Sequence, residues 1–156
     1  MQETAPAGPL ALPLPPLLLA AAIMVGVLLN VLWPQALLET WLRLTLGILM
    51  ISAALAIGFL AVRVMRAVNT PLDVRKAPTE VVTTGVFAIS RNPVYLAMVL
   101  LCGGIAFLAN TIWLLLAAAA LAVILHTQVI DKEEAYLKEK FGEAYSSYKS
   151  RVRRWI

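Results

Sequence analysis

The chain has 156 residues, of which 61% are hydrophobic and 14% are charged, and its mean hydropathy is +0.83. Soluble domains average roughly 45–50% apolar and about 25% charged residues, so this composition excludes a soluble globular protein and indicates an integral membrane protein. The single cysteine, Cys102, excludes an intrachain disulfide and a cysteine-rich metal site, and no metal is expected. The net charge of +4 is interpreted as a topology and lipid-surface signal, and no nucleic-acid partner is expected.

Four apolar segments follow one another along the chain, at residues 10–33, 41–64, 93–108 and 112–130. A helix rises about 1.5 Å per residue and must cross about 30 Å of hydrocarbon, so each segment is a candidate membrane span, the third at the short end of the range. Prolines interrupt the first segment, and its helix is expected to begin near Pro16 or Leu17. The predicted fold class is all-α: an integral membrane helical bundle of about four transmembrane helices with a C-terminal cytoplasmic helix.

We expect one domain with four parts. Residues 1–64 hold two N-terminal transmembrane helices, and residues 65–92 form a cytoplasmic loop. Residues 93–130 form a transmembrane hairpin, which is tight and antiparallel because its connection, residues 109–111, is very short. Residues 131–156 form a cytoplasmic tail.

Charge predicts the orientation. Residues 1–42 contain no Lys or Arg, so the first segment is predicted to be a retained helix and not a cleaved signal peptide. With four spans, every basic residue except Arg43 lies on the same side as both termini, and the positive-inside rule makes that side cytoplasmic. These residues are Arg63, Arg66, Arg75, Lys76, Arg91, Lys132, Lys138, Lys140, Lys149, Arg151, Arg153 and Arg154.

The loop and the tail differ in pattern. The loop is rich in turn residues and has no helical period. The tail is amphipathic from Lys132 to Phe141, and Gly142 suits a helix end or a kink. Taken alone, the tail could equally be an interfacial helix whose Lys and Tyr side chains rest on lipid headgroups.

A series of motifs in order spans about residues 69–156. It consists of Thr84-Gly85-Val86-Phe87, Ser90-Arg91-Asn92-Pro93-Val94-Tyr95, the membrane hairpin, His126, Glu133-Glu134-Ala135-Tyr136-Leu137, Phe141-Gly142-Glu143-Ala144-Tyr145, Tyr148 and Val152-Arg153. The series resembles the isoprenylcysteine carboxyl methyltransferase and phospholipid methyltransferase superfamily. The resemblance implies an integral membrane methyltransferase that uses S-adenosylmethionine, held between the last two transmembrane helices, the loop and the tail. For this chain it implies the bacterial inner membrane, with an active site facing the cytoplasm.

Side-chain chemistry agrees with that cofactor, which carries a carboxylate, an ammonium, a sulfonium and an adenosine. Arg91 and the N-terminus of the following helix favour a carboxylate, and Glu133 and Glu134 can take the ammonium or the ribose hydroxyls. The predicted catalytic residues are Arg91, Glu133 and Glu134. The predicted cofactor-binding residues are Gly85, Arg91, Asn92, Tyr95, His126, Glu133, Glu134, Leu137, Tyr145 and Arg153.

One position departs from the family pattern. Many members have His where this chain has Asn92, and an amide cannot titrate, although it still donates and accepts hydrogen bonds. His126 is expected near the cytoplasmic mouth as a cofactor contact, with a hydrogen-bonded histidine inside the bundle as the alternative.

The methyl acceptor stays open. The first hypothesis is a lipophilic, membrane-embedded acceptor, such as an isoprenylcysteine-like carboxylate or a related lipid or small hydrophobic molecule, which enters from the membrane. A carboxylate or thiolate needs no base, whereas an ammonium must first lose a proton to Glu133, Glu134 or His126. The alternatives are a phospholipid amine N-methyltransferase, a membrane protein that binds cofactor or lipid without turnover, and a small structural membrane protein whose motifs are coincidental.

Overall fold

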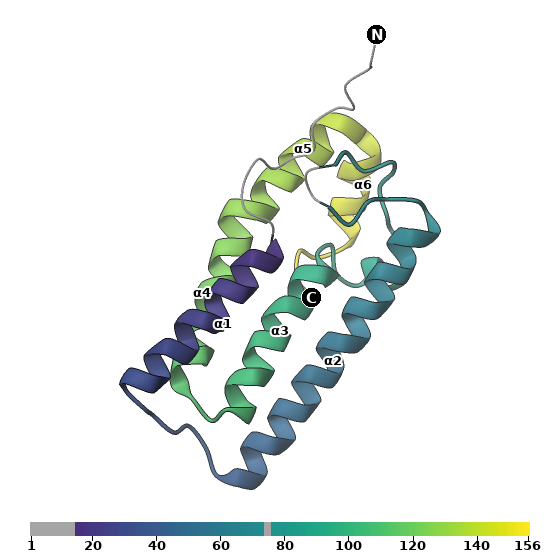
Figure 1. Ribbon diagram of the computed structural model, residues 1–156. Helices are drawn as coiled ribbons and strands as arrows, with labels where there is room; N and C mark the ends of the chain where they lie inside the picture. Colours follow the sequence, from purple (N-terminus) through teal and green to yellow (C-terminus); the bar gives the residue numbers. More distant parts are fainter. Residues whose placement is uncertain (1–14, 74–75) are drawn as a thin grey trace.

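The computed structural model describes residues 15–73 and 76–156. The predicted start of the first apolar segment at Leu10 and the basic residue Arg75 lie outside the described residues. Long helices run side by side, and the loop after the second one gathers with the end of the chain at one end of the bundle (Figure 1).

The first two helices are α1 (Pro15–Leu32) and α2 (Thr40–Ala67). The hairpin is formed by α3 (Pro93–Leu108) and α4 (Ile112–Ile124), and α2 packs along α3 while α1 packs along α4. The loop between α2 and α3 contains one short 3₁₀ turn, η1 (Gly85–Ala88). The all-helical fold class is thus confirmed.

The fourth apolar segment and the tail helix are one continuous helix. After α4 comes a six-residue π-helix, η2 (Leu125–Ile130), which leads directly into α5 (Asp131–Phe141). No Pro or Gly occurs between residues 112 and 141, so nothing in the sequence breaks the helix where its apolar part ends. Gly142 ends α5 with a φ of +52°, which favours glycine, and α6 (Glu143–Arg151) turns back toward the bundle, as expected of a helix end at this position.

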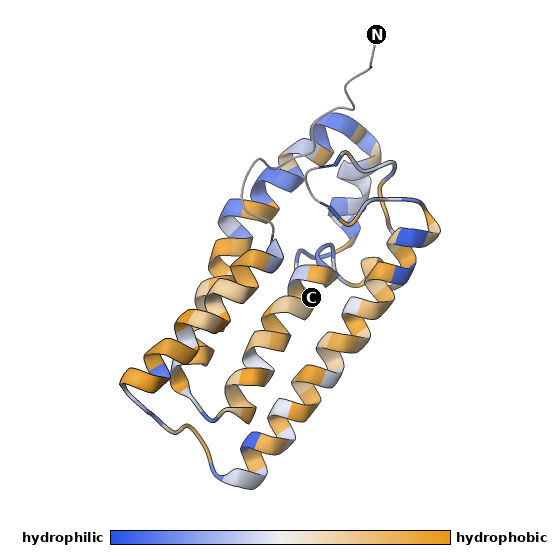
Figure 2. Cartoon of the chain, in the orientation of Figure 1, coloured by the Kyte–Doolittle hydropathy of each residue, from blue (hydrophilic) through white to orange (hydrophobic). Residues whose placement is uncertain are grey.

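The helices differ in their ability to span a membrane. Three of the described helices are long and apolar enough: Pro15–Leu32, Thr40–Ala67 and the 30-residue helix Ile112–Phe141. α3 has 16 residues, or about 24 Å at 1.5 Å per residue. The continuous helix Ile112–Phe141 has 30 residues and extends past the N-terminus of α3 (Figure 1). Figure 2 shows apolar residues along the bundle and polar ones gathered at the end that holds α5 and α6.

The far end of the bundle is closed by backbone and side-chain bonds. Asn110, in the hairpin connection, accepts hydrogen bonds at Oδ1 from the backbone N–H groups of Leu37 and Leu38, both at 3.0 Å. Arg43 Nη1 donates to the carbonyl of Leu108 at 2.7 Å. These bonds tie the α1–α2 connection to the hairpin and leave the opposite end available for a site.

Glycine allows α2 and α3 to approach closely. A Cβ built on Gly104 would lie 2.7 Å from Ile51 Cγ1 and 3.1 Å from both the Gly47 carbonyl oxygen and the Ile51 backbone nitrogen. Two of these three atoms belong to the backbone of α2, which cannot move aside as a side-chain tip can. Small residues at such crossings bring helix backbones together in membranes.

Replacing Gly104 with Ala is therefore expected to destabilise the bundle by roughly 1–3 kcal/mol, the usual cost of overpacking. The measurement is the thermal unfolding midpoint in detergent. Gly58→Ala is the matched control, because a Cβ on Gly58 would meet Ala97 Cβ at an ordinary 3.6 Å. Equal midpoints for the two variants would contradict this account of the α2–α3 contact.

Candidate functional site

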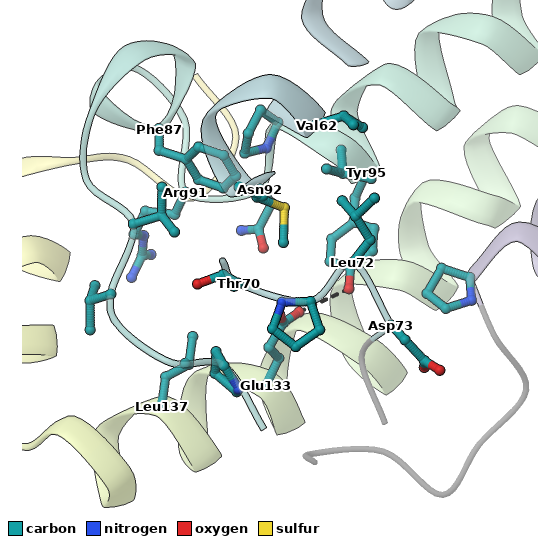
Figure 3. A pocket seen from close by; sticks show the side chains of 18 of the residues that line it. Val62, Thr70, Leu72, Asp73, Phe87, Arg91, Asn92, Tyr95, Glu133 and Leu137 are labelled. Carbon is teal, nitrogen blue, oxygen red and sulfur yellow. Dashed lines mark hydrogen bonds between the residues drawn. The ribbon is translucent and has the colours of Figure 1, made fainter. Parts of the chain in front are cut away.

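A cavity of about 470 Å³ lies at the polar end of the bundle, within the range of about 300–1,000 Å³ that is usual for ligand pockets. Residues of the loop within 70–73 and 76–87, the start of α3, α5 and α6 surround it. Figure 3 shows Arg91 and Asn92 on one side of the cavity and Glu133 and Leu137 on the helix that faces them. Its apolar lining includes Pro15, Pro16, Val62, Met65, Val94 and Met98 from α1, α2 and α3.

Arg91 precedes α3 and is held by its backbone, whose N–H donates to the carbonyl of Arg153 at 3.0 Å. Its side chain is only 9% exposed, and Nη2 lies 3.2 Å from Glu134 Oε1. Two further guanidinium nitrogens, Nε and Nη1, are buried and bond no residue that the structure describes. Buried polar groups are nearly always hydrogen-bonded, so these donors indicate a place for an anionic or carbonyl ligand.

Glu134 is the buried centre of an ion cluster. Oε1 accepts from Arg154 Nε at 2.9 Å and faces Arg91 Nη2, while Oε2 accepts from Lys149 Nζ at 2.8 Å and Arg154 Nη2 at 2.9 Å. Three cations from three parts of the chain therefore meet on one carboxylate. A buried carboxylate requires such partners to keep its charge.

The neighbouring Glu133 is placed differently. Its Oε2 accepts a hydrogen bond of 2.9 Å from the hydroxyl of Tyr95, across the cavity between α5 and α3 (Figure 3). Its Oε1 makes no hydrogen bond with any residue in the described parts of the chain. Both residues line the cavity, so Tyr95 orients the carboxylate of Glu133, and no described residue occupies its second oxygen.

Two tyrosines of α6 close the cavity. Tyr148 donates from its hydroxyl to the Phe87 carbonyl at 2.7 Å and so ties α6 to η1. Burial, and next the charge of Glu134, raises the pKa of Tyr145 to about 12. The Tyr145 phenol is therefore neutral over the physiological range, and it offers a hydrogen bond and an apolar ring rather than a charge.

Asn92 lies at the cavity edge and binds the end of the chain. Its Nδ2 donates to the carbonyl of Arg154 at 2.9 Å, and its backbone N–H donates to Ser90 Oγ at 3.1 Å. Pro93 then begins α3, in the first helical position where proline is favoured. Asn92 therefore joins the start of α3 to the residues after α6.

Asn92→Asp removes this donor and sets a carboxylate oxygen against the Arg154 carbonyl, so docking of the tail is expected to weaken by about 1–3 kcal/mol. Amide hydrogen exchange of residues 143–156 measures this as faster exchange. Asn69→Asp is the control, because Asn69 is exposed in the loop. Unchanged protection in Asn92→Asp would show that the amide does not hold the tail.

The cavity brings together seven of the ten predicted cofactor-binding residues and leaves out three. The seven are Arg91, Asn92, Tyr95, Glu133, Glu134, Leu137 and Tyr145. Gly85 is exposed at the start of η1, where its φ of +60° favours glycine, so the turn explains this residue. His126 lies in η2 and does not line the cavity. Its Nε2 is 2.9 Å from Arg154 Nη1, and its Nδ1 is 3.3 Å from Trp155 Nε1. This is the alternative of a hydrogen-bonded histidine inside the bundle.

Arg153 reaches the site through its backbone alone. Its side chain is exposed, whereas its carbonyl accepts from Arg91 and it pairs with Ser90 in a parallel bridge. The next residue, Arg154, directs its side chain inward to Glu134. α6 ends at Arg151, and Val152 is extended at φ −120° and ψ 132°, so consecutive side chains beyond the helix point in opposite directions. The sequence shows the two adjacent arginines but not which one faces inward.

The described structure is that of an integral membrane helical protein with a charged, partly apolar ligand cavity at one end of its bundle. The model of the phospholipid methyltransferase family matches residues 42–144, and the chain belongs to this family of membrane methyltransferases, which generally use S-adenosylmethionine. The match runs from α2 to the start of α6 and stops before Arg154. An uncharacterised protein of Haemophilus influenzae is 42% identical over 67 residues, which are 40% of this chain and 98% of that protein.

Proposed function

We propose that this protein transfers the methyl group of S-adenosylmethionine to a lipophilic acceptor embedded in the membrane. The observation that carries the proposal is Arg91, a residue of the cavity lining: two buried donors of its guanidinium, Nε and Nη1, have no hydrogen-bond partner among the described residues, and much of the remaining lining is apolar. A cavity with one charged and one apolar part suits a polar cofactor beside a hydrophobic acceptor.

The residues present fit S-adenosylmethionine. Arg91 and the first-turn N–H groups of α3 would hold its carboxylate, because those N–H groups have no acceptor within the helix. Glu133 would take the ammonium or the ribose hydroxyls through its remaining oxygen, and Leu137 and Tyr145 would contact the adenosine. When bound, the cofactor supplies a methyl group on a positively charged sulfur for in-line displacement.

The chain's own contribution is positioning. Alignment of two reactants can lower an activation barrier by about 7–11 kcal/mol. In this protein, α5, α6 and the loop would provide that alignment by enclosing the cavity. Lys140 Nζ donates to the Pro78 carbonyl at 2.7 Å, which ties α5 to the loop, and Tyr148 ties α6 to η1. These ties would exclude bulk water from the polar part of the cavity.

The acceptor would enter the apolar part from the membrane. Pro15, Val62, Met65 and Met98 line this part, and all four belong to helices of the bundle. An isoprenylcysteine-like carboxylate would be nucleophilic as it stands. The basic residues at this end would place the site on the cytoplasmic side, in a bacterium on the inner membrane.

An amine acceptor, as in phospholipid N-methylation, is the second candidate, and Glu133 favours it. This carboxylate is held by Tyr95 and keeps one oxygen that makes no hydrogen bond to a described residue. A carboxylate so placed can attract an ammonium and receive its proton before methyl transfer. A methylated amine in the product would support this candidate, and a methyl ester would support the carboxylate.

Calorimetric titration of the detergent-solubilised protein tests the cofactor part of the proposal. We expect saturable binding of one S-adenosylmethionine, and of the demethylated product S-adenosylhomocysteine, per chain. A monodisperse protein that binds neither compound would overturn the proposed function.

A further inference from the structure

We infer that Arg154 is a positioning residue that holds Arg91 in its ligand-binding place through Glu134, so that the two adjacent glutamates have different tasks. This inference rests on the proposed function. It departs from the expectation that Glu133 and Glu134 both touch the cofactor.

The hydrogen-bonding capacity of Glu134 is already used. A carboxylate has two oxygens with about four lone-pair sites in all. Each oxygen of Glu134 meets two nitrogens: Oε1 those of Arg154 and Arg91, and Oε2 those of Arg154 and Lys149. A cofactor ammonium or hydroxyl could bind Glu134 only by displacing one of these cations, whereas Glu133 needs no such exchange.

Arg154 supplies two of those four contacts and is itself fixed on several sides. Its Nε and Nη2 bind Glu134 in a bidentate arrangement, and Nη1 lies 2.9 Å from both Asp131 Oδ1 and His126 Nε2. Its carbonyl oxygen accepts from Asn92. One residue therefore connects η2 and α5 to the start of α3, and planar bidentate pairs of this kind set geometry as well as energy.

Arg91 has only one contact with Glu134, through Nη2, and its Nε and Nη1 have no partner among the described residues. Without the Arg154 guanidinium, two lone-pair sites of Glu134 become available. Arg91 can then close onto Glu134 with two parallel N–H bonds, the preferred pairing of arginine with a carboxylate. Lys149 cannot prevent this, because its side chain is 47% exposed and contributes a single contact. Glu134 would then take up at least one of the two donors that now lack a partner, Nε and Nη1, and that donor would be lost to a ligand.

The test compares Arg154→Ala and Arg154→Lys with Arg153→Ala, a neighbour that loses the same charge from an exposed side chain. KM for S-adenosylmethionine and kcat are measured in detergent or nanodiscs with labelled cofactor and extracted lipid. Arg154→Ala should raise KM about tenfold with kcat within about twofold, in line with the coupling that residues acting through another residue transmit. Arg154→Lys should recover part of the loss, and Arg153→Ala should stay within about twofold in KM.

Two results would overturn the inference while leaving the proposed function standing. One is Arg154→Ala behaving as Arg153→Ala does. The other is a fall in kcat at unchanged KM, which reports a smaller folded fraction and a purely structural arginine. An unmodified protein that neither binds nor consumes the cofactor would overturn the proposed function, and this inference with it.

Discussion

A chain that ends at Gly142 is expected to insert its apolar helices and to lose S-adenosylmethionine binding entirely. The deleted residues provide Tyr145 and Tyr148 of the cavity wall and two of the three cations on Glu134. They also provide the carbonyl oxygens that accept from the Arg91 backbone and the Asn92 side chain. Glu134 and Arg91 would then pair only with each other, at a cavity open to water. Calorimetry with the purified protein measures the loss.

Removal of Ile156 alone is the matched control, because this residue is 70% exposed. The control should bind as the full chain does, and both shortened proteins should elute from size-exclusion chromatography as monodisperse peaks. Normal binding by the chain that ends at Gly142 would mean that the tail is an interfacial anchor and that the binding site lies within the hairpin.

Glu133→Gln is expected to weaken S-adenosylmethionine binding by roughly 1.5–3 kcal/mol, the range for a hydrogen bond to a charged group, which is about 10- to 150-fold in affinity. The amide keeps the size of the side chain and can still accept from the Tyr95 hydroxyl. The change removes the negative charge and replaces one acceptor oxygen with an N–H donor. The ammonium and the ribose are common to S-adenosylmethionine and S-adenosylhomocysteine, so both should lose affinity to a similar extent.

The control for this variant is Glu139→Gln, the same change at an exposed position of the same helix. Both compounds should bind it as they bind the unmodified protein. Equal affinities for Glu133→Gln and Glu139→Gln would remove Glu133 from the cofactor site and leave it for the acceptor or for structure.

Much of the fold could be predicted, because the length and hydropathy of each apolar segment are enough to identify it as a helix of a membrane bundle. The helix end at Gly142 could also be predicted, since glycine is favoured at helix ends that need a positive φ, and Gly142 has one. The continuation of α4 through η2 into α5 could not be predicted. The change from apolar to charged residues at Asp131 suggests a helix boundary, but no Pro or Gly ends the helix there. Hydropathy reports the surroundings of a helix and not its length.

The candidate site was predictable where motifs lie on regular helices and less so at their ends. Tyr95, Glu133 and Leu137 were identified by the motif series and by side-chain chemistry, and they line the cavity from the regular helices α3 and α5. The inward direction of Arg154 depends on where α6 ends, and the position of His126 outside the cavity lining depends on η2. If a helix ends one residue earlier or later, the side chains that follow it change from facing inward to facing outward. Local pattern cannot resolve that choice.

Transfer of a labelled methyl group is the direct test of the proposed methyltransferase activity. The purified protein in nanodiscs, supplied with methyl-labelled S-adenosylmethionine and a membrane lipid extract, is assayed by partition of the label into organic solvent. We predict label in a lipid product, whose mass spectrum identifies the acceptor as a carboxylate or an amine. We also predict a strong loss of that product in the chain that ends at Gly142. Saturable cofactor binding with no labelled lipid from bacterial membrane extracts would contradict the proposed activity and leave a protein that binds without turnover.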